Sequence, residues 1–430
     1  MALATHSSYS LHELFMNTTL IVFAALLTLK LMVELWLALL NQRSVLKARG
    51  MVPPAFREMI DEATYVKSVN YTLARNRFAM LNTIFQALLL GTVILTGLLP
   101  WAFGELTGWL GVSVWAQAGV LIILGAALAL PGLPLDYWEQ FHLEERFGFN
   151  KSTVPLWVMD KIKGAAMTLM IGYPLLCAVL GFFTQQPQTW WLWGFGLFWG
   201  LQLLIMVVYP IWILPLFNRL EELPEGALRD RLMQLATSAR FRVRGIQVMD
   251  GSRRSGHSNA FFCGLGHFRR IVLFDTLLEQ LKPEEVEAVL AHEIGHYRLG
   301  HIPKMLLFAG GLSFIGFATL GWLAQRPWFF ENFGFVVDTG TAAPALLLFG
   351  LLGGLATFWL TPLFNQISRR HEFAADAFAK QSLKNGAPLV DALRKLSEKN
   401  LSNLTPHPFY SGFYYSHPTL LEREAALQEP

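Results

Sequence analysis

Charged residues are scarce in this chain. Asp, Glu, Lys and Arg make up 15% of its 430 residues, whereas a soluble protein carries about a quarter. Hydrophobic residues instead reach 53%. The net charge of only +3 comes without a basic arm, so we expect no nucleic-acid partner. This composition is typical of an integral membrane protein.

Cysteine is nearly absent as well. The two cysteines, Cys177 and Cys263, lie far apart, one in an apolar run and one in a polar region. We therefore expect no disulfide, and a reducing compartment is permitted. The sequence also shows no internal repeat and no low-complexity tract.

Long apolar runs are abundant. Seven are long enough to span a bilayer of ~30 Å, which takes roughly 20 helical residues each. The first has no basic residue before it and is too long for the apolar region of a signal peptide, so we expect it to be retained. The seven runs are residues 14–40, 79–99, 112–130, 165–183, 190–214, 305–324 and 343–363.

The basic residues are distributed unevenly between the connections. Of the 34 Lys and Arg residues, 32 fall in connections on one side, and the other two are Lys30 and Arg326. Because basic residues accumulate on the cytosolic face, we expect the N-terminus outside and the C-terminus in the cytosol.

One sizeable polar insertion lies between the fifth and sixth runs. Residues 227–239 have a helical pattern, and three short β-like segments with Gly-containing turns follow. These segments are residues 245–250, 257–263 and 269–274. The predicted division is residues 1–215 (five spans with cytosolic loops), 216–304 (protease insertion), 305–365 (two spans) and 366–430 (C-terminal cytosolic segment completing the site).

The segment His292-Glu293-Ile294-Gly295-His296 has the H-E-x-x-H pattern of zinc hydrolases. Two histidines four apart on a helix face the same way, so both imidazoles reach one ion, and zinc prefers such ligands. Glu293 can take a proton from water at the metal. Pro283 suits the first turn of such a helix. Chance alone also produces this pattern, so other residues have to support it.

A catalytic zinc site needs a third protein ligand. The metzincin pattern places a histidine six residues after His296, but His301 comes five after it, so we expect His301 to be a polar residue at the membrane border. Glu372 is the better candidate. Asp376, one turn further on the same helix face, is placed to hold a ligand histidine by its second ring nitrogen. The alternative for Glu372 and Asp376 is an ordinary solvated helix face.

On a seven-span frame, the H-E-x-x-H motif with Glu372 and Asp376 resembles the CAAX prenyl protease 1 family of integral-membrane zinc metalloendopeptidases. Three further segments are similar to signatures of that family: one after the third span, one at the substrate-edge strand and one near the C-terminus. They are residues 144–151 (EERFGFNK), 257–264 (HSNAFFCG) and 416–420 (SHPTL). The resemblance covers most of the chain.

The resemblance implies a mainly α-helical fold. Seven transmembrane helices would form a barrel around a hydrated chamber, with a small α+β zinc metalloprotease domain on the cytosolic side. It also implies one zinc ion per chain, Zn²⁺, bound by His292, His296 and Glu372, with Glu293 as the general base.

The other residues of the site follow from the same resemblance. Asp376 would support the site or donate a proton, His417 would face the developing oxyanion, and Arg423 would brace the site. A substrate peptide would add as a further strand along an edge. That edge is implied to contain Asn259, Ala260 and Phe261.

Two charged residues, Lys30 and Glu34, lie inside the first span. Intramembrane charges are costly and usually face protein or water. The pair therefore fits a hydrated chamber, although at i and i+4 the two residues could equally just pair with one another.

These observations predict a membrane metalloendopeptidase that cleaves peptide bonds near the cytosolic membrane face. Its partners would be the lipid bilayer and peptide or protein substrates, including prenylated or membrane-anchored ones. The resemblance implies removal of residues behind a prenylated cysteine or, in a bacterial host, quality control of membrane proteins. The membrane would be the bacterial inner membrane, or the endoplasmic reticulum in a eukaryote.

Two alternatives belong to other classes. One is a transporter that uses Lys30 and Glu34 and carries a structural zinc site, and the other is an inactive scaffold. A structural site normally has four protein ligands and gives Glu293 no role, so both alternatives fit the sequence less well.

Overall fold

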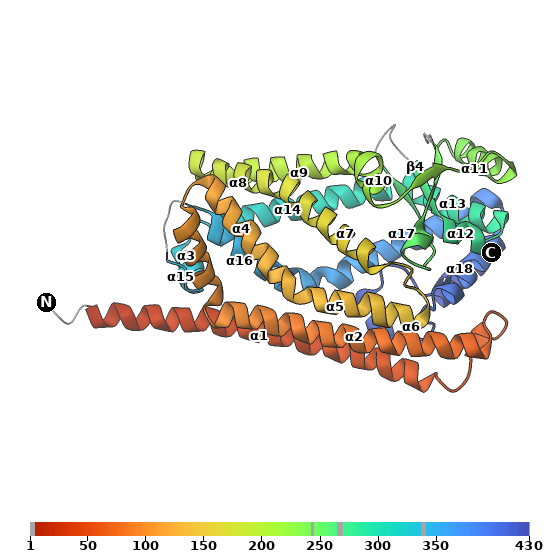
Figure 1. Cartoon of the computed structure of the whole chain (residues 1–430). Coiled ribbons are helices and arrows are strands. Elements are labelled where there is room, and N and C mark those ends of the chain that lie inside the picture. The colour runs from red at the N-terminus through yellow and green to blue at the C-terminus, as the bar shows by residue number, and fades with distance from the viewer. Residues whose placement is uncertain (1–4, 242–244, 265–269, 337–340, 430) are drawn as a thin grey trace.

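The computed structural model describes residues 5–241, 245–264, 270–336 and 341–429, without the side chains of residues 5–17. Long helices dominate it and run roughly along one direction (Figure 1). The helices are α1 (Thr5–Lys47), α2 (Glu62–Leu95), α3 (Leu98–Leu110), α4 (Val114–Ala129), α5 (Leu133–Trp138), α6 (Glu145–Phe147), α7 (Val154–Met167), α8 (Tyr173–Gln185), α9 (Trp190–Val208), α10 (Leu214–Phe217), α11 (Ala227–Ser238), α12 (Asp275–Gln280), α13 (Pro283–Arg298), α14 (His301–Leu323), α15 (Pro327–Glu331), α16 (Ala343–Thr357), α17 (Thr361–Leu383), α18 (Ala387–Lys399), α19 (Pro408–Tyr414) and α20 (Leu420–Gln428).

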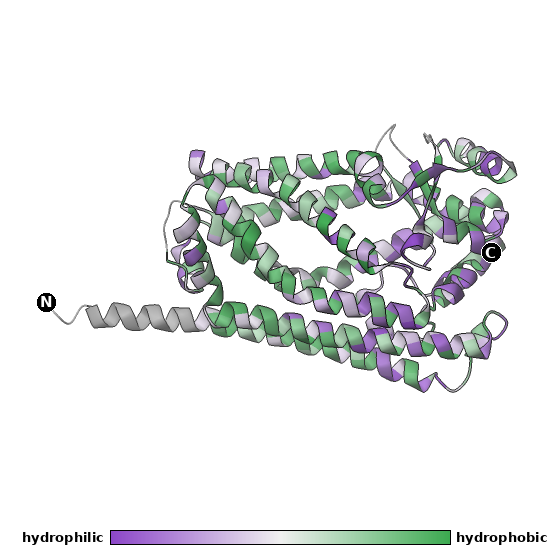
Figure 2. Ribbon diagram, in the orientation of Figure 1, coloured by the Kyte–Doolittle hydropathy of each residue, from purple (hydrophilic) through white to green (hydrophobic). Residues whose placement is uncertain are grey.

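Seven helical stretches of the described chain are long and apolar enough to cross a membrane, which confirms the predicted number. Several of these stretches are longer than the apolar runs predicted from the sequence. Hydrophobic residues cover the helices away from the sheet, and hydrophilic residues gather at the end that carries it (Figure 2). The stretches are Thr18–Lys47, Glu62–Leu95, Val114–Phe147, Val154–Gln185, Trp190–Phe217, His301–Leu323 and Ala343–Leu383.

The end opposite the sheet is closed by α3 and α15, which the sequence pattern did not predict (Figure 1). Both contribute to the largest buried apolar cluster of the molecule, α3 through Leu99 and Phe103 and α15 through Phe329 and Phe330. The connections on this side are therefore packed against the spans rather than loose.

A four-stranded sheet of order β1-β2-β4-β3 lies at the polar end. Strands β2 and β4 pair in parallel and the other pairs are antiparallel, which leaves β3 at one edge. All three predicted strands are present, but the second begins only at Ala260, and Arg269 of the third lies outside the described residues. The strand β1 was not predicted. The bounds are β1 (Leu220–Glu222), β2 (Ile246–Met249), β3 (Ala260–Cys263) and β4 (Arg270–Phe274).

The core of this polar end forms between the sheet and helices α11, α13, α17 and α18. Helices α13 and α17 approach each other closely at Gly295, where an added Cβ would lie 3.0 Å from the Ala375 Cα. A larger residue at either position would separate the two helices. The glycine thus allows residues of α13 to meet residues of α17.

A cavity of about 1270 Å³ and a smaller one of about 410 Å³ lie among the spans and the C-terminal segment, and Asn82 lines both. We call them together the chamber. Lys30 and Glu34 line the smaller cavity and also form an ion pair of 2.8 Å, so the two explanations for this pair both apply. Cys177 and Cys263 are both free, as predicted.

Candidate metal centre

Helix α13 begins at a well-defined N-terminus. Pro283 occupies the first turn, and the Glu285 carboxylate accepts a hydrogen bond from the Lys282 backbone N–H (2.8 Å) while also pairing with Lys395 (2.7 Å). Acidic residues and proline both favour a helix start. The helix fixed in this way carries His292 and His296 on one face.

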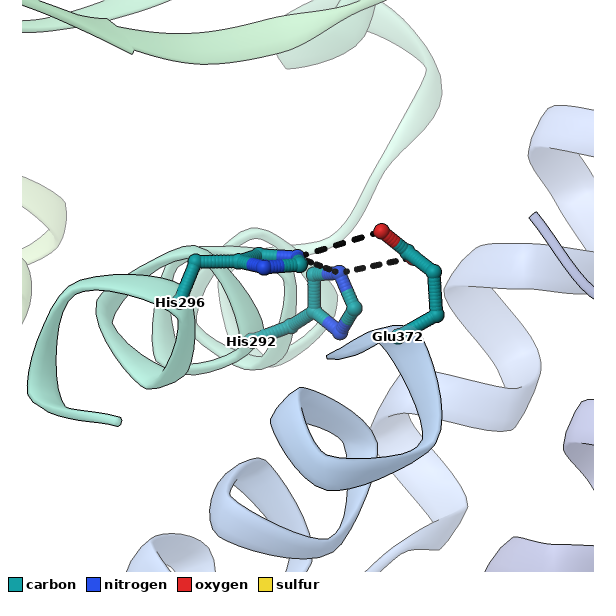
Figure 3. Close-up of side chains that lie close together, drawn as sticks. All are labelled: His292, His296 and Glu372. Carbon is teal, nitrogen blue, oxygen red and sulfur yellow. Dashed lines mark hydrogen bonds and ion pairs between the residues drawn. The ribbon is translucent and has the colours of Figure 1, made fainter. Parts of the chain in front are cut away.

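Three ligand atoms converge where α13 meets α17 (Figure 3). The Nε2 atoms of His292 and His296 are 3.2 Å apart, and the Glu372 carboxylate oxygens lie 3.4 Å from the first and 3.2 Å from the second. Zinc bonds of about 2.0–2.1 Å at tetrahedral angles place ligand atoms about 3.3 Å apart. The spacing of the three residues therefore fits zinc.

The Glu372 carboxylate gives further evidence for a cation at this point. It is only 4% exposed, and its Oε2 is buried without accepting a hydrogen bond from any described residue. Burial lowers the pKa of His292, but the neighbouring carboxylates of Asp376 and Glu372 outweigh it and raise the pKa to about 9. The arrangement thus favours positive charge where the ligand atoms meet.

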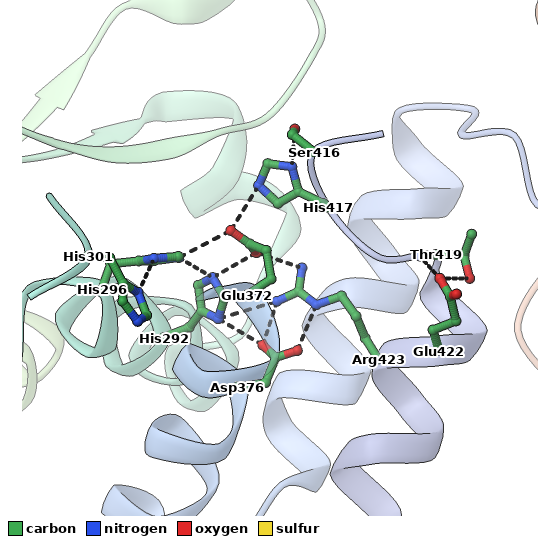
Figure 4. Close-up of polar contacts among 10 residues, drawn as sticks. All are labelled: His292, His296, His301, Glu372, Asp376, Ser416, His417, Thr419, Glu422 and Arg423. Atoms are coloured by element: carbon green, nitrogen blue, oxygen red, sulfur yellow. Dashed lines mark hydrogen bonds and ion pairs between the residues drawn. The ribbon is translucent and has the colours of Figure 1, made fainter. Parts of the chain in front are cut away.

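The second ring nitrogen of His292 is held by charged groups (Figure 4). Its Nδ1 lies 2.7 Å from Asp376 Oδ1, and Arg423 Nε donates to Asp376 Oδ2 (2.8 Å). Asp376 is 1% exposed and Arg423 8%. Because Glu372 and Asp376 are both buried, they do not form an ordinary solvated helix face, and the supporting roles of Asp376 and Arg423 stay predictions.

The second ring nitrogen of His296 meets another imidazole. Its Nδ1 lies 3.0 Å from Nδ1 of His301, and the His301 ring stacks on His371 with centroids 4.0 Å apart. His301 is 5% exposed. His301 was predicted to be a polar residue at the membrane border, and it does begin the candidate span α14, but it is also buried against His296.

Glu293 lies between the two histidines on α13. Burial raises the pKa of its carboxyl, while the nearby positive charges of His292, His296 and Arg423 oppose that rise. A carboxylate with a raised pKa is better matched to accept and return a proton near neutral pH.

The C-terminal segment brings His417 to the same place. Thr419 and Glu422 form a capping box that starts α20, so the chain turns sharply just after His417. The His417 Nε2 then lies 3.4 Å from Glu372 Oε1, and its Nδ1 lies 2.9 Å from Ser416 Oγ. The side chain is 63% exposed and also lines the larger cavity, so it faces the space above the ligands.

The edge strand β3 contains Ala260 and Phe261, and Asn259 comes just before it. The Asn259 carbonyl still accepts a hydrogen bond from the Phe274 N–H of β4 (3.1 Å), so the pairing begins one residue earlier than the strand. Strand β3 forms the edge of the sheet, which is the position that an added peptide strand requires.

The segment of residues 144–151 supports the chain that leads into this strand. The Tyr71 hydroxyl donates to the Glu144 carboxylate (2.8 Å), and Phe149 stacks on His257 with centroids 4.0 Å apart. The His257 Nδ1 also lies 3.2 Å from the Asn400 side-chain oxygen. These contacts tie the start of β3 to α2 and to the C-terminal segment.

The fold and this centre together define a membrane-embedded metalloprotease. Residues 42–219 match the family model described as CAAX prenyl protease N-terminal, five membrane helices, and residues 222–430 match Peptidase family M48. The chain belongs to the CAAX prenyl protease 1 family.

Several relatives show this membership. The Saccharomyces cerevisiae CAAX prenyl protease 1 is 37% identical over 411 residues, which are 87% of this chain and 88% of that protein. The Homo sapiens homolog is 31% identical and covers 95% of each chain. The crystal structure of S. mikatae Ste24p has a TM-score of 0.89 at 33% identity, covering 95% of this chain and 99% of that one.

Proposed function

We propose that the chain is a zinc metalloendopeptidase whose metal is held by His292, His296 and Glu372. The single observation that carries the proposal is the ligand spacing of 3.2–3.4 Å. A bound zinc ion would supply Lewis acidity to water and to the scissile carbonyl. The three-ligand set leaves one tetrahedral position for substrate or water, which argues against a purely structural site.

The protein's own residues then divide the work. Glu293 accepts the proton of the attacking water and returns it to the leaving amine. His417 faces the position where negative charge develops and stabilises it by a hydrogen bond. Asp376 and Arg423 hold the His292 ring in the tautomer whose Nε2 is free to ligate.

The proposed substrates are polypeptides presented at the membrane. His296 lies five residues before the first residue of span α14, which is about 7 Å along a helix. The relatives are named prenyl proteases, so we include a prenylated cysteine in the proposed substrate. We further propose that the centre faces the cytosol, because 32 of 34 basic residues lie on that side.

The metal is tested by removal and return. Purified protein should contain one zinc per chain, lose peptide cleavage with a chelator and regain it with zinc. His296→Ala should lose both zinc and activity because it removes a ligand. Active protein without stoichiometric metal would contradict the proposal.

The base is tested with Glu293→Gln, which keeps the size of the side chain but cannot accept a proton. Base catalysis contributes about 10²- to 10⁴-fold, so turnover of a farnesylated C-a-a-X peptide should fall by that amount while zinc content stays unchanged. The matched control is Glu284→Gln at the exposed start of the same helix. Equal turnover for Glu293→Gln and the control would reject this mechanism.

A further inference from the structure

An apolar cavity of about 740 Å³ lies between α9 and α14, next to β3. Among the described lining residues no side chain is charged, and Gln202 and Ser313 are among the few polar ones. Cavities of this size with apolar walls and a few polar groups suit small hydrophobic ligands. We call this cavity the α9–α14 groove.

One wall of the groove is a single face of α14. Ile302, Leu306, Ala309 and Ser313 line it, at spacings of four, three and four residues. That stripe spans about 16 Å along the helix, which is close to half of the ~30 Å hydrocarbon core. Measured along α14, the groove therefore extends from the first turn of this candidate span over a length that matches about one leaflet.

The opposite wall is a single face of α9. Phe198, Gln202 and Ile205 of α9 line it, and Tyr209 follows just past the end of that helix, at the same spacings of four, three and four residues. Two matching helix faces thus oppose each other across a space of leaflet depth.

Tight packing joins the two helices both alongside the groove and beyond it. An added Cβ at Gly310 would lie 2.9 Å from the Trp199 ring, and one at Gly321 would lie 2.6 Å from the Trp191 ring. Trp199 also lines the groove. The two helices therefore pack tightly at Gly310, alongside the groove, and again at Gly321, beyond Ser313, the last residue of α14 that lines it.

One end of the groove meets the proposed substrate-binding strand. Phe261, Phe262 and Cys263 of β3 line it, together with Tyr297, the residue directly after the ligand His296. A peptide paired with the edge of β3 would thus pass the mouth of the groove close to the metal centre.

We propose that the α9–α14 groove binds the isoprenoid chain of the substrate's prenylated cysteine while the peptide pairs with β3. This inference rests on the proposed function. The uncharged lining and the leaflet depth fit a chain that already resides in the cytosolic leaflet. The continuity with β3 fits a chain that is covalently attached to the peptide.

The test narrows the groove with Ala309→Phe. Ala309 is an exposed residue of α14, so the larger ring fills the groove without overpacking the core. Each CH₂ kept out of the groove weakens binding roughly fourfold, and two or three such groups raise KM for a farnesylated peptide roughly 15- to 60-fold. KM for the same peptide with an S-methylated cysteine should change less than about twofold. Leu307→Phe, on the lipid-facing side of α14, is the matched control.

A second measurement does not depend on turnover. A farnesylated peptide with a photoreactive group on its isoprenoid is crosslinked to the Glu293→Gln variant, and the labelled residues are identified by mass spectrometry. We expect labels on the facing stripes of α9 and α14. These labels should disappear when Ala309→Phe is added to the same variant. Labels confined to the chamber would overturn the proposal.

The outcomes separate this inference from the proposed function. Wild-type protein that cleaves neither peptide would contradict the proposed function. Suppose that both peptides are cleaved and Ala309→Phe changes KM equally for both, or for neither. The proposed protease function would then stand, but the groove assignment would be overturned. Equal effects would assign the groove to protein packing or to a structural lipid.

Discussion

The two ligand histidines of α13 are supported by different chemistry. On the His292 side, Asp376 and Arg423 form a buried ion pair behind the ring. On the His296 side, the partner is the imidazole of His301, and the side chain of His296 is 20% exposed. Figure 4 shows the charged side, with Asp376 and Arg423, and the imidazole side, with His296 and His301, on different sides of Glu372.

The difference separates two tasks. A buried ion pair whose hydrogen bonds are satisfied fixes orientation, but it is costly to break. A carboxylate partner also makes the imidazole more basic, and therefore a stronger metal ligand, than a neutral partner does. We infer that the His292 side fixes the orientation of its ligand ring. The His296 side holds its ligand less rigidly, next to the space where His417 and the substrate edge meet.

The largest effect should follow from breaking the charged side. Asp376→Ala leaves the Arg423 guanidinium buried without its partner, which destabilises a protein by about 3–5 kcal/mol. We expect a lower unfolding temperature and loss of zinc, measured by thermal unfolding in detergent and by metal analysis. Asp391→Ala, at an exposed position of α18, is the control and should change neither.

A double variant sharpens this prediction. Asp376→Leu with Arg423→Met removes both charges, and replacing a buried pair by apolar residues often restores stability. Stability should recover while zinc affinity stays low, because His292 still lacks its carboxylate. Recovery of both would mean that Asp376 acts only through packing.

The next effect concerns the open side of the site. His417→Ala removes a hydrogen-bond donor to the oxyanion but no ligand, so zinc should be retained while turnover falls about 10²- to 10³-fold. Ser416→Ala keeps the imidazole and should lose far less. A loss of zinc in His417→Ala would make His417 a ligand instead of an oxyanion donor.

Much of this molecule could be predicted from local patterns. Apolar length identified the seven spans, and i to i+4 spacing placed His292 with His296 and Glu372 with Asp376. Both patterns depend only on helix geometry. The predicted division into four segments and the predicted orientation in the membrane remain predictions.

The features that were missed depend on tertiary contacts. Strand β1 has only three residues, too few for an alternation pattern to be visible. Helices α3 and α15 are short connections that are stabilised by burial against the spans. His301 was assigned by its sequence spacing alone, whereas its contact with His296 depends on a tight turn at Gly300, whose φ of 67° favours glycine.

The turn at Gly300 brings His301 to His296, and removing this contact should have the smallest of the predicted effects. It also tests most directly how the supports of His292 and His296 differ. With Nε2 of His296 facing the metal, its Nδ1 carries the proton and donates it to Nδ1 of His301. His301→Phe keeps the ring that stacks on His371 but removes the acceptor. Loss of such a partner typically costs 10- to 100-fold in metal affinity, measured by chelator competition.

Two matched variants separate hydrogen bonding from packing at this position. His301→Asn loses the stacked ring but presents an amide oxygen one bond from Cγ, as Nδ1 is, so it should retain most of the affinity. His371→Phe keeps the stacking and touches no hydrogen bond to His296, so it should behave as wild type. If His301→Asn loses as much affinity as His301→Phe, the stacked ring supports His296 rather than the acceptor. His301 would then support His296 by ring packing, whereas Asp376 supports His292 by a charged hydrogen bond.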